Sequence, residues 1–271
     1  MHTPLSSATA PPPRTSPLHY LKQATAGLLG RESPAYLDLY HRVVRRPRFP
    51  SVADLVHRYA AAHRDRTVTF AQIGANEGAT EDVLYYPIHR YGWRGVLVEP
   101  QDAEFARLRE NYRANPRVAY EHAAVIAPGA EAPELHYVVP EPGLPAWVSK
   151  LSSFDAAITR QVLSAYPSAR LAKRGVRGTT LADLLARHDL ERVEVLVTDT
   201  EGYDYEILKQ IDWSGMRPDL IIYEHRHLSE RDAQSLGVTL AAQGYASFSG
   251  ELDTAAVRDP GVLAIYGDRM T

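Results

Sequence analysis

A glycine-containing turn at residues 72–78 is the first segment whose residue types could bind a ligand. It reads QIGANEG, follows a β-rich run and precedes a helical pattern. Glycine permits a sharp turn and a close approach of the backbone to a ligand. A dinucleotide-binding loop would have glycine at the three places that here hold Gly74, Asn76 and Ala79. The Asn76 side chain would crowd a pyrophosphate, so the turn favours a nucleoside without phosphates over NAD.

An acidic residue, Glu99, ends the next β-rich run after this turn. A carboxylate at that place can accept hydrogen bonds from both hydroxyls of a ribose. The turn and Glu99 together predict a site that holds the two ends of a single adenosyl ligand.

Four more polar residues follow the fourth and fifth β-rich runs. Asp199 and Glu201 lie in TDTEGYD, and Glu224 and His225 lie in YEHRH. Because the carboxyl ends of neighbouring parallel strands meet at one edge of a sheet, we expect these side chains to cluster there.

Such a cluster supports two kinds of chemistry, and one structural role competes with both. His225 or Asp199 could act as a general base, which is our preferred hypothesis. Alternatively, Asp199, Glu224 and His225 could hold Mg²⁺, which would lower the pKa of a bound hydroxyl. Capping of the following helix is the structural alternative for Asp199 and Glu201.

These segments, taken in order, resemble the FkbM family of methyltransferases over roughly residues 67–250. The resemblance implies a class I methyltransferase fold, S-adenosylmethionine as cofactor, and methyl transfer to oxygen on a natural product or saccharide. The matching pieces are QIGANEG at 72–78, GWRGVLVEPQ at 92–101, LSSFD at 151–155, TLADLLARHDL at 180–190, VLVTDTEGYDYEIL at 195–208 and PDLIIYEHRHL at 218–228.

The strand-end positions and the resemblance together assign roles to individual residues. The expected catalytic residues are Asp199, Glu201, Glu224 and His225. One position departs from the family: Gln72 stands where many members have Asp, so it lacks the charge that would favour the cofactor's ammonium group. The predicted cofactor contacts are Gln72, Gly74, Asn76, Gly78, Glu99, Pro100, Gln101, Ala123, Ser153 and Asp199.

The elements that must position these residues alternate between strand and helix patterns. This alternation predicts an α/β fold with a mostly parallel, doubly wound, seven-stranded sheet and an antiparallel last strand. The predicted helices lie near 79–90, 102–114, 203–208 and 229–243. The predicted strands are 68–73, 94–98, 118–125, 194–198 and 220–223, with a final antiparallel pair near 245–249 and 262–266.

Three regions are expected around this pattern. Residues 1–17 are rich in Pro, Ser and Thr and predict a disordered tail. Residues 18–64 predict a helical extension that serves as a lid or as a homodimer contact. Residues 65–271 form the methyltransferase domain, with an insertion at about 127–178. The aromatic residues of this insertion, Trp147, Phe154 and Tyr166, are the predicted acceptor pocket.

The composition of the chain argues against several classes of function. The 271-residue chain has a formal net charge of −3, so no global positive field favours nucleic acid or membrane surfaces. It has no cysteine, which excludes thiolate chemistry. We expect a cytoplasmic enzyme with a small-molecule or saccharide acceptor. Two alternatives are a non-catalytic S-adenosylmethionine-binding module, encouraged by Gln72, and an NAD-dependent oxidoreductase or epimerase, opposed by Asn76 and Ala79.

Overall fold

The computed structural model describes residues 50–80, 82–131, 133–266 and 270. The chain divides into two compact units, Met1–Arg46 and Pro47–Thr271, and the described residues all belong to the second. The predicted tail at 1–17 and most of the predicted extension at 18–64 lie outside them. No helix among the described residues is both long and apolar enough to span a lipid bilayer.

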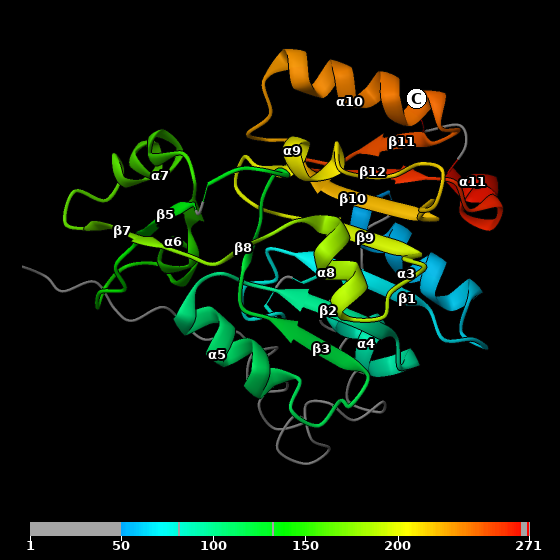
Figure 1. Ribbon diagram of the computed structural model, residues 1–271, viewed down its shortest axis with the longest axis horizontal. Coiled ribbons are helices and arrows are strands. Elements are labelled where there is room, and N and C mark those ends of the chain that lie inside the picture. Colours follow the sequence, from blue (N-terminus) through cyan, green and yellow to red (C-terminus); the bar gives the residue numbers. More distant parts are fainter. Residues whose placement is uncertain (1–49, 81, 132, 267–269, 271) are drawn as a thin grey trace, which may run out of the picture. The chain divides into compact units, whose positions relative to one another are not determined.

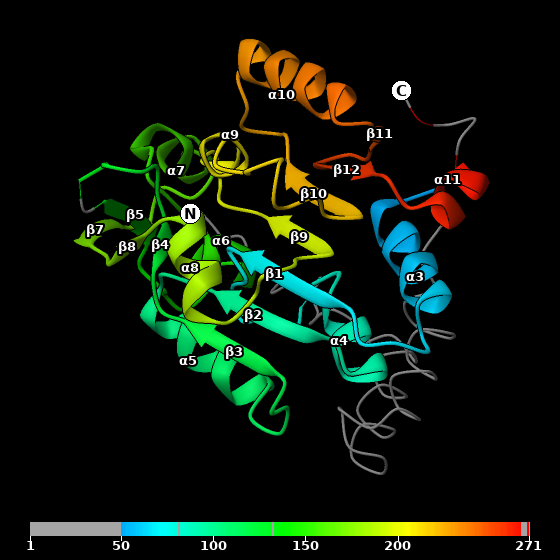
Figure 2. The same ribbon diagram turned by 45° about the vertical axis from the view of Figure 1, so that its right-hand side comes forward.

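A seven-stranded sheet forms the centre of the second unit (Figures 1 and 2). The last strand in the chain runs antiparallel to both of its neighbours, and the other pairs are parallel. The predicted mostly parallel sheet with an antiparallel last strand is therefore confirmed. In spatial order the strands are β11 (Ala246–Ser249), β12 (Asp253–Val257), β10 (Leu220–Glu224), β9 (Val195–Thr198), β1 (Thr69–Ile73), β2 (Arg94–Val98) and β3 (Val118–Glu121).

Helices cover both faces of this sheet because its strands are apolar on both sides. In β9, Val195 and Val197 pack into one core while Leu196 packs into the other. The first face is covered by α3 (Val52–Ala62), α4 (Tyr85–Tyr91), α5 (Asp102–Asn111) and α11 (Pro260–Tyr266). The second face is covered by α8 (Leu181–Arg187), α9 (Asp204–Leu208) and α10 (Glu230–Ala242).

Helix α3 lies within the predicted N-terminal extension and belongs to the first of these layers. Its Ser51 N-cap side chain accepts a hydrogen bond from the Asp54 amide at 3.0 Å. Leu55, Val56 and Tyr59 of this helix are fully buried in the core. This part of the extension therefore stabilises the sheet.

The strand register aligns the ends that carry the predicted site. Ile73 is paired with Val98 on one side and with Thr198 on the other, and Thr198 is paired with Tyr223. The segments that follow β1, β2, β9 and β10 therefore begin at the same edge of the sheet. The order in which the strands follow one another along the chain reverses between β1 and β9. Parallel sheets covered by helices on both faces bind ligands at such a point.

The structure corrects the predicted strand at 262–266, which is the helix α11. Asp259 Oδ1 accepts a hydrogen bond from the Val262 amide at 2.8 Å, and Pro260 occupies the first helical position. An aspartate followed by proline is a typical helix start. The strand that pairs with β11 is β12, whose sequence DTAAV is too weakly apolar to stand out as a strand.

Two further boundaries differ from those predicted. The helix expected at 79–90 begins later, at α4, because Asp82 Oδ1 accepts hydrogen bonds from the amides of Leu84 and Tyr85 and holds a turn. The strand expected at 118–125 is divided into β3 and a short strand, β4 (Ala124–Val125). Strand β4 leaves the central sheet and pairs with β8 (Gly178–Thr179).

Residues 134–175 form a second, three-stranded antiparallel sheet with the order β6-β5-β7. Figures 1 and 2 show it beside the edge toward which the arrowheads of the central parallel strands point. A small core of Val138, Val148 and Leu151 holds it together. Its elements are β5 (Glu134–Val138), α6 (Ala146–Lys150), β6 (Ser152–Ser153), α7 (Ala156–Leu163) and β7 (Leu171–Gly175).

Candidate functional site

A pocket lies at the carboxyl ends of β1, β2 and β9. Both the central sheet and the residues of the second sheet contribute to its walls. Of the predicted cofactor contacts, the structure places Gly74, Asn76, Glu99, Pro100, Ala123 and Asp199 in its lining. The second sheet contributes Leu135, Lys150, Ser152 and Phe154.

Gly74 makes the closest backbone approach in the site. Its φ is +80°, a conformation that residues with a side chain rarely adopt. A Cβ atom at this position would lie 1.8 Å from the carbonyl oxygen of Asp199. The turn after β1 can therefore lie against the end of β9 only because residue 74 is glycine.

Glu99 fixes the shape of this turn from the neighbouring strand. Its Oε2 accepts a hydrogen bond from the Asn76 amide, and its Oε1 accepts one from the Gln101 amide, both at 2.8 Å. The side chain is 2% exposed. Burial raises the pKa of Glu99 to about 7, although the two amide donors oppose the shift. Each oxygen has a second lone pair with which it could accept a ligand hydroxyl.

Asn76 offers a second polar contact. Its side-chain Oδ1 is buried and has no hydrogen-bond partner among the described residues, while the residue lines the pocket. Buried polar atoms are almost always paired in native proteins. An unpaired acceptor on a residue that lines the pocket fits a ligand that donates a hydrogen bond there.

Two predicted cofactor contacts from the turn lie behind the pocket wall. Gln72 Nε2 donates to Asp82 Oδ2 at 2.7 Å, and neither residue lines the pocket. Gly78 packs against Leu108 and Tyr112, where an added Cβ would lie 2.5 Å from one and 2.7 Å from the other. Gln72 and Gly78 therefore shape the turn from behind, and Asp82 adds a carboxyl group beside the position where many family members have Asp.

Two other predicted contacts connect the second sheet to the pocket. Gln101 Nε2 donates to the carbonyl oxygen of Lys150 at 2.7 Å. Ser153 Oγ donates to the carbonyl oxygen of Glu201 at 2.6 Å. Neither residue lines the main pocket. Both instead hold the segment from α6 to β6 against the carboxyl ends of β2 and β9.

Lys150 is a pocket residue that sequence reasoning missed. Its Nζ forms an ion pair with Glu77 Oε2 on the turn after β1. This contact and the favourable Lys150 charge hold the pKa of Glu77 below its usual value, against the effect of burial. No local pattern could have indicated it, because the two residues meet only when the second sheet packs against the turn.

The pocket contains one of the three predicted aromatic residues. Phe154 lines the pocket and stacks edge-on against Tyr203, with ring centroids 5.0 Å apart. The same two rings border a second hollow together with Ser153, Asp155 and Gly202. The other two predicted aromatics, Trp147 and Tyr166, stack on each other away from both.

Asp199 stands at the end of β9 and lines the pocket. Its amide donates to the carbonyl oxygen of Ile73 at 2.9 Å, which ties the residue to β1. The side chain reaches solvent through the pocket, but the walls around it raise its pKa well above the usual value, and the charges of Glu201 and Asp204 add to the shift. Helix α9 has Tyr203 as its N-cap without a side-chain hydrogen bond, so Asp199 and Glu201 do not cap it.

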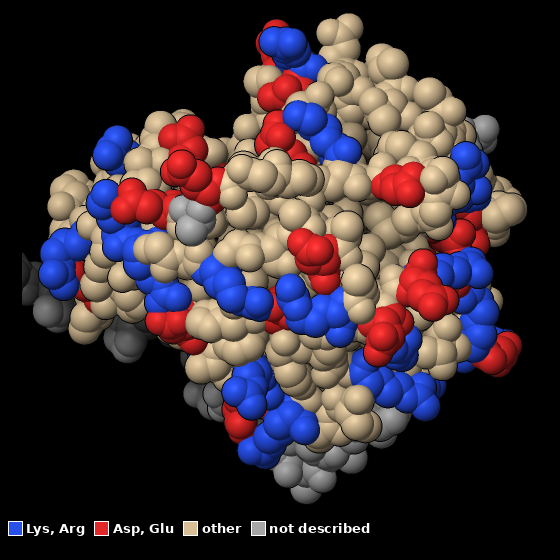
Figure 3. All heavy atoms as spheres, viewed as in Figure 1, with Lys and Arg blue, Asp and Glu red and all other residues tan. Residues whose placement is uncertain are grey.

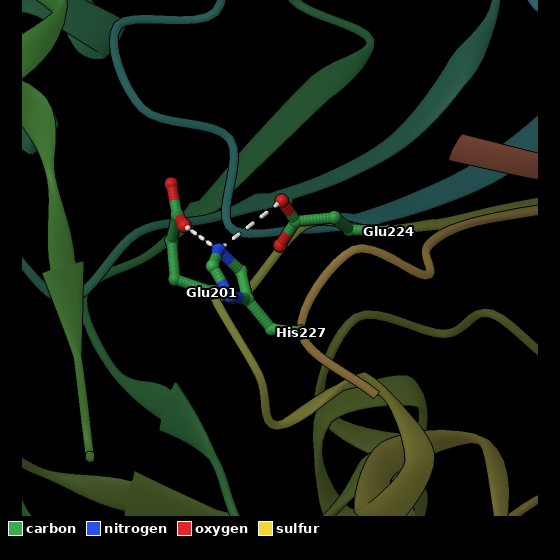
Figure 4. Close-up of side chains that lie close together, drawn as sticks. All are labelled: Glu201, Glu224 and His227. Atoms are coloured by element: carbon green, nitrogen blue, oxygen red, sulfur yellow. Dashed lines mark ion pairs between the residues drawn. The ribbon is translucent and has the colours of Figure 1, made fainter. Parts of the chain in front are cut away.

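Beside Asp199, an imidazole joins two of the predicted acids, but it belongs to His227 (Figure 4). His227 Nε2 lies 3.0 Å from Glu201 Oε2 and 3.7 Å from Glu224 Oε1. Glu224 is buried, and this burial together with the charges of Glu201 and Asp199 raises its pKa to about 9. Glu201 lines the pocket, so the cluster adjoins it.

The predicted role of His225 is corrected by this arrangement. His225 Nδ1 instead forms a 3.0 Å hydrogen bond with Thr254 Oγ1 on β12. The Leu228 amide donates to the His225 carbonyl oxygen, and the resulting turn returns His227 over Glu224. Among residues 50–80, 82–131, 133–266 and 270, the predicted Mg²⁺ ligands Asp199, Glu224 and His225 do not form a ligand group, whereas Glu201, Glu224 and His227 do.

Comparison with known proteins shows which protein family the chain matches. A family model described as the methyltransferase FkbM domain matches residues 72–249, which include every predicted site residue. Comparison with curated proteins gives no match.

Among solved structures, the chain is similar to three methyltransferases at low identity. The O-methyltransferase from Bacillus cereus in complex with SAH is 12% identical, with 88% of this chain and 97% of that chain covered and a TM-score of 0.38. The precorrin-6y C5,15-methyltransferase from Geobacter metallireducens GS-15 is 10% identical, with 74% and 86% covered and a TM-score of 0.38. The RNA methyltransferase from Salinibacter ruber in complex with S-adenosyl-L-homocysteine is 12% identical, with 78% and 90% covered and a TM-score of 0.35.

Proposed function

Because the chain belongs to the FkbM methyltransferase family, we propose that it transfers the methyl group of S-adenosylmethionine to a hydroxyl oxygen of a small-molecule or saccharide acceptor. The observation that supports this most directly is the single pocket that joins Glu99 and Asn76 to Asp199 and Glu201. The end of the pocket with Glu99 and Asn76 suits a nucleoside, and the end with Asp199 and Glu201 presents carboxylates to an acceptor.

The residues at the first end fit the adenosyl cofactor. Glu99 has free lone pairs for the ribose hydroxyls, and Asn76 Oδ1 is an unpaired acceptor. Glycine at residue 74 lets the turn after β1 lie against the end of β9, where a Cβ atom would lie 1.8 Å from the carbonyl oxygen of Asp199. We propose that Asp82, held by Gln72 behind the turn, takes the structural place of the carboxyl group that many family members have at position 72.

Bound S-adenosylmethionine supplies an electrophilic methyl group on a positively charged sulfur. The pocket walls would orient the acceptor oxygen toward this methyl group, and such positioning would provide much of the rate. The acceptor oxygen would gain the methyl group, and the cofactor would leave as the uncharged thioether S-adenosylhomocysteine. Asp199 lines the pocket beside Gly74 and takes the hydroxyl proton.

The chemistry of the acceptor side favours an uncharged, hydroxylated ligand. Phe154 and Tyr203 provide an aromatic wall for the apolar face of a ring. Asp199 and Glu201 would accept hydrogen bonds from hydroxyls but repel phosphates. On the face shown in Figure 3, Lys and Arg side chains are interspersed with Asp and Glu, and they form no continuous basic surface. We therefore propose a small molecule or sugar as the acceptor in preference to nucleic acid.

Titration calorimetry of the full chain tests the cofactor. We expect one saturable site for S-adenosylhomocysteine with micromolar affinity and no measurable heat with NAD. Saturable binding of NAD, or no binding of S-adenosylhomocysteine, would refute the proposal. If the cofactor product binds but no hydroxylated acceptor in a broad panel is methylated, the chain is a binding module and not a catalyst.

Cofactor affinity should depend on pH through Glu99. Only the carboxylate form accepts hydrogen bonds at both oxygens, and in the free protein its pKa is raised to about 7. Affinity for S-adenosylhomocysteine should therefore be full above this pH and fall about tenfold per unit below it. Calorimetry between about pH 5.5 and 8.5 measures the slope. The Glu99→Gln variant should bind more weakly with little pH dependence, and a flat wild-type profile would exclude Glu99 as the ribose acceptor.

A further inference from the structure

We propose that Glu201, Glu224 and His227 bind one divalent transition-metal ion beside the methyl-transfer pocket. The three residues come from two neighbouring strand ends, Glu201 after β9 and the other two at the end of β10 (Figure 4). Their ligand atoms all lie within 4.8 Å of one another.

The distances within this trio suit a common ion. Ligand atoms about 2.1 Å from a metal lie about 3.0 Å apart at a right angle and about 4.2 Å apart on opposite sides. The imidazole Nε2 lies 3.0 Å from Glu201 Oε2 and 3.7 Å from Glu224 Oε1. An ion could therefore be held with small side-chain movements and without a change in the backbone.

An unpaired buried atom independently indicates a missing partner at this place. Glu224 Oε2 is buried and has no hydrogen-bond partner among the described residues. Its side chain is only 7% exposed, and its carboxylate points toward His227 in Figure 4. Leaving a carboxylate oxygen buried without a partner is costly, and a cation would satisfy it.

The charges around the trio favour a cation over a purely structural ion pair. Asp199, Asp204 and Asp253 all act on Glu224 as further like charges. In the described part of the chain, His227 is the one basic side chain that forms an ion pair with Glu201 or Glu224. A divalent ion would add positive charge to a cluster of acidic groups for which the described residues supply one imidazole.

The donor set indicates which cations fit. Two carboxylate oxygens and an imidazole nitrogen suit ions such as Mn²⁺, Fe²⁺ or Zn²⁺, whereas Mg²⁺ and Ca²⁺ prefer oxygen donors alone. A soft thiolate site is excluded because the chain has no cysteine. The imidazole of His227 therefore favours a transition-metal ion over the Mg²⁺ that the sequence suggested.

The role of such an ion rests on the proposed function, although its binding does not. Glu201 also lines the pocket, so the ion would lie next to the acceptor oxygen. Its positive charge would lower the pKa of the acceptor hydroxyl and leave the proton for Asp199 to remove.

Direct metal binding by the full chain tests the proposal. Protein freed of metal with a chelator is titrated with Mn²⁺, and free Mn²⁺ is followed by electron paramagnetic resonance. We expect one site per chain, with Mg²⁺ competing at least tenfold more weakly. Glu224→Gln and His227→Asn should each weaken Mn²⁺ binding by at least about tenfold. Mn²⁺ should raise the Tm of the wild type but not of these variants.

The matched control is His225→Asn, which removes a neighbouring imidazole that binds Thr254 and lies outside the trio. It should bind Mn²⁺ as the wild type does. Equal binding by all four proteins, a loss in His225→Asn as well, tighter binding of Mg²⁺ than Mn²⁺, or no saturation by about 1 mM would overturn the proposal. Binding of S-adenosylhomocysteine, measured separately on the metal-free protein, shows whether the proposed function holds regardless of the metal result.

Discussion

Replacing Gly74 with alanine is expected to weaken S-adenosylhomocysteine binding by about 100-fold or more and to lower the free energy of unfolding by more than about 2 kcal/mol. The added Cβ would lie 1.8 Å from the Asp199 carbonyl oxygen and 2.7 Å from its carbon. Neither backbone can move away easily, because the Asp199 amide is bonded to the Ile73 carbonyl within the paired strands. Calorimetry and urea unfolding measure the two effects.

The chain offers a closely matched control in Gly244, whose φ is +82° and near which an added Cβ would meet nothing within 4 Å. Alanine there bears the same conformational cost, about 1 kcal/mol, without the steric contact. It should leave cofactor binding unchanged. If both variants lose similar stability and bind equally well, the close approach of the two strand ends is unimportant for the site.

Replacing Asp199 with asparagine is expected to reduce methyl transfer by about 10²–10⁴-fold while cofactor binding is largely retained. The amide has the same shape but cannot take a proton from the acceptor hydroxyl. The residue's backbone contacts with Ile73 and Gly74 do not involve its side chain, so the turn should keep its form. Release of S-adenosylhomocysteine with any acceptor that the wild type methylates measures turnover, and calorimetry measures binding.

Asp183→Asn is the corresponding control, because this carboxylate accepts a hydrogen bond from the hydroxyl of Thr180, the N-cap of α8, and does not line the pocket. It should turn over at close to the wild-type rate. Near-normal turnover in Asp199→Asn would assign proton removal to another group. A parallel loss of cofactor binding would make Asp199 a binding residue instead.

Much of the fold could be predicted because it depends on local patterns. Strands β9 and β10 are continuous apolar runs, which is what a strand buried on both faces requires. The segments that were predicted wrongly do not show such a clear sequence pattern. Strand β12 contains two alanines, and the 260–266 segment is apolar enough to be mistaken for a strand although Asp259 and Pro260 begin a helix there.

The site likewise has a part that the sequence could predict and a part that it could not. Gly74, Glu99 and Asp199 each directly follow a strand, and strand pairing alone brings them to one edge. The direction of a side chain beyond a strand end depends on the turn that follows. That is why the imidazole in the cluster belongs to His227, while His225, the first residue after β10, binds Thr254.

The order of residues along the chain was enough to predict the alternating sheet, the glycine turn after β1 and the acid after β2, because these follow from hydrophobic period and strand direction. Tertiary packing was needed to bring Lys150 to Glu77, Ser153 to Glu201 and Glu201 to His227. The residues in each contact lie far apart in the chain or on separate turns, so no periodic sequence pattern indicates that they meet. Their geometry arises only when the second sheet and the strand ends pack together.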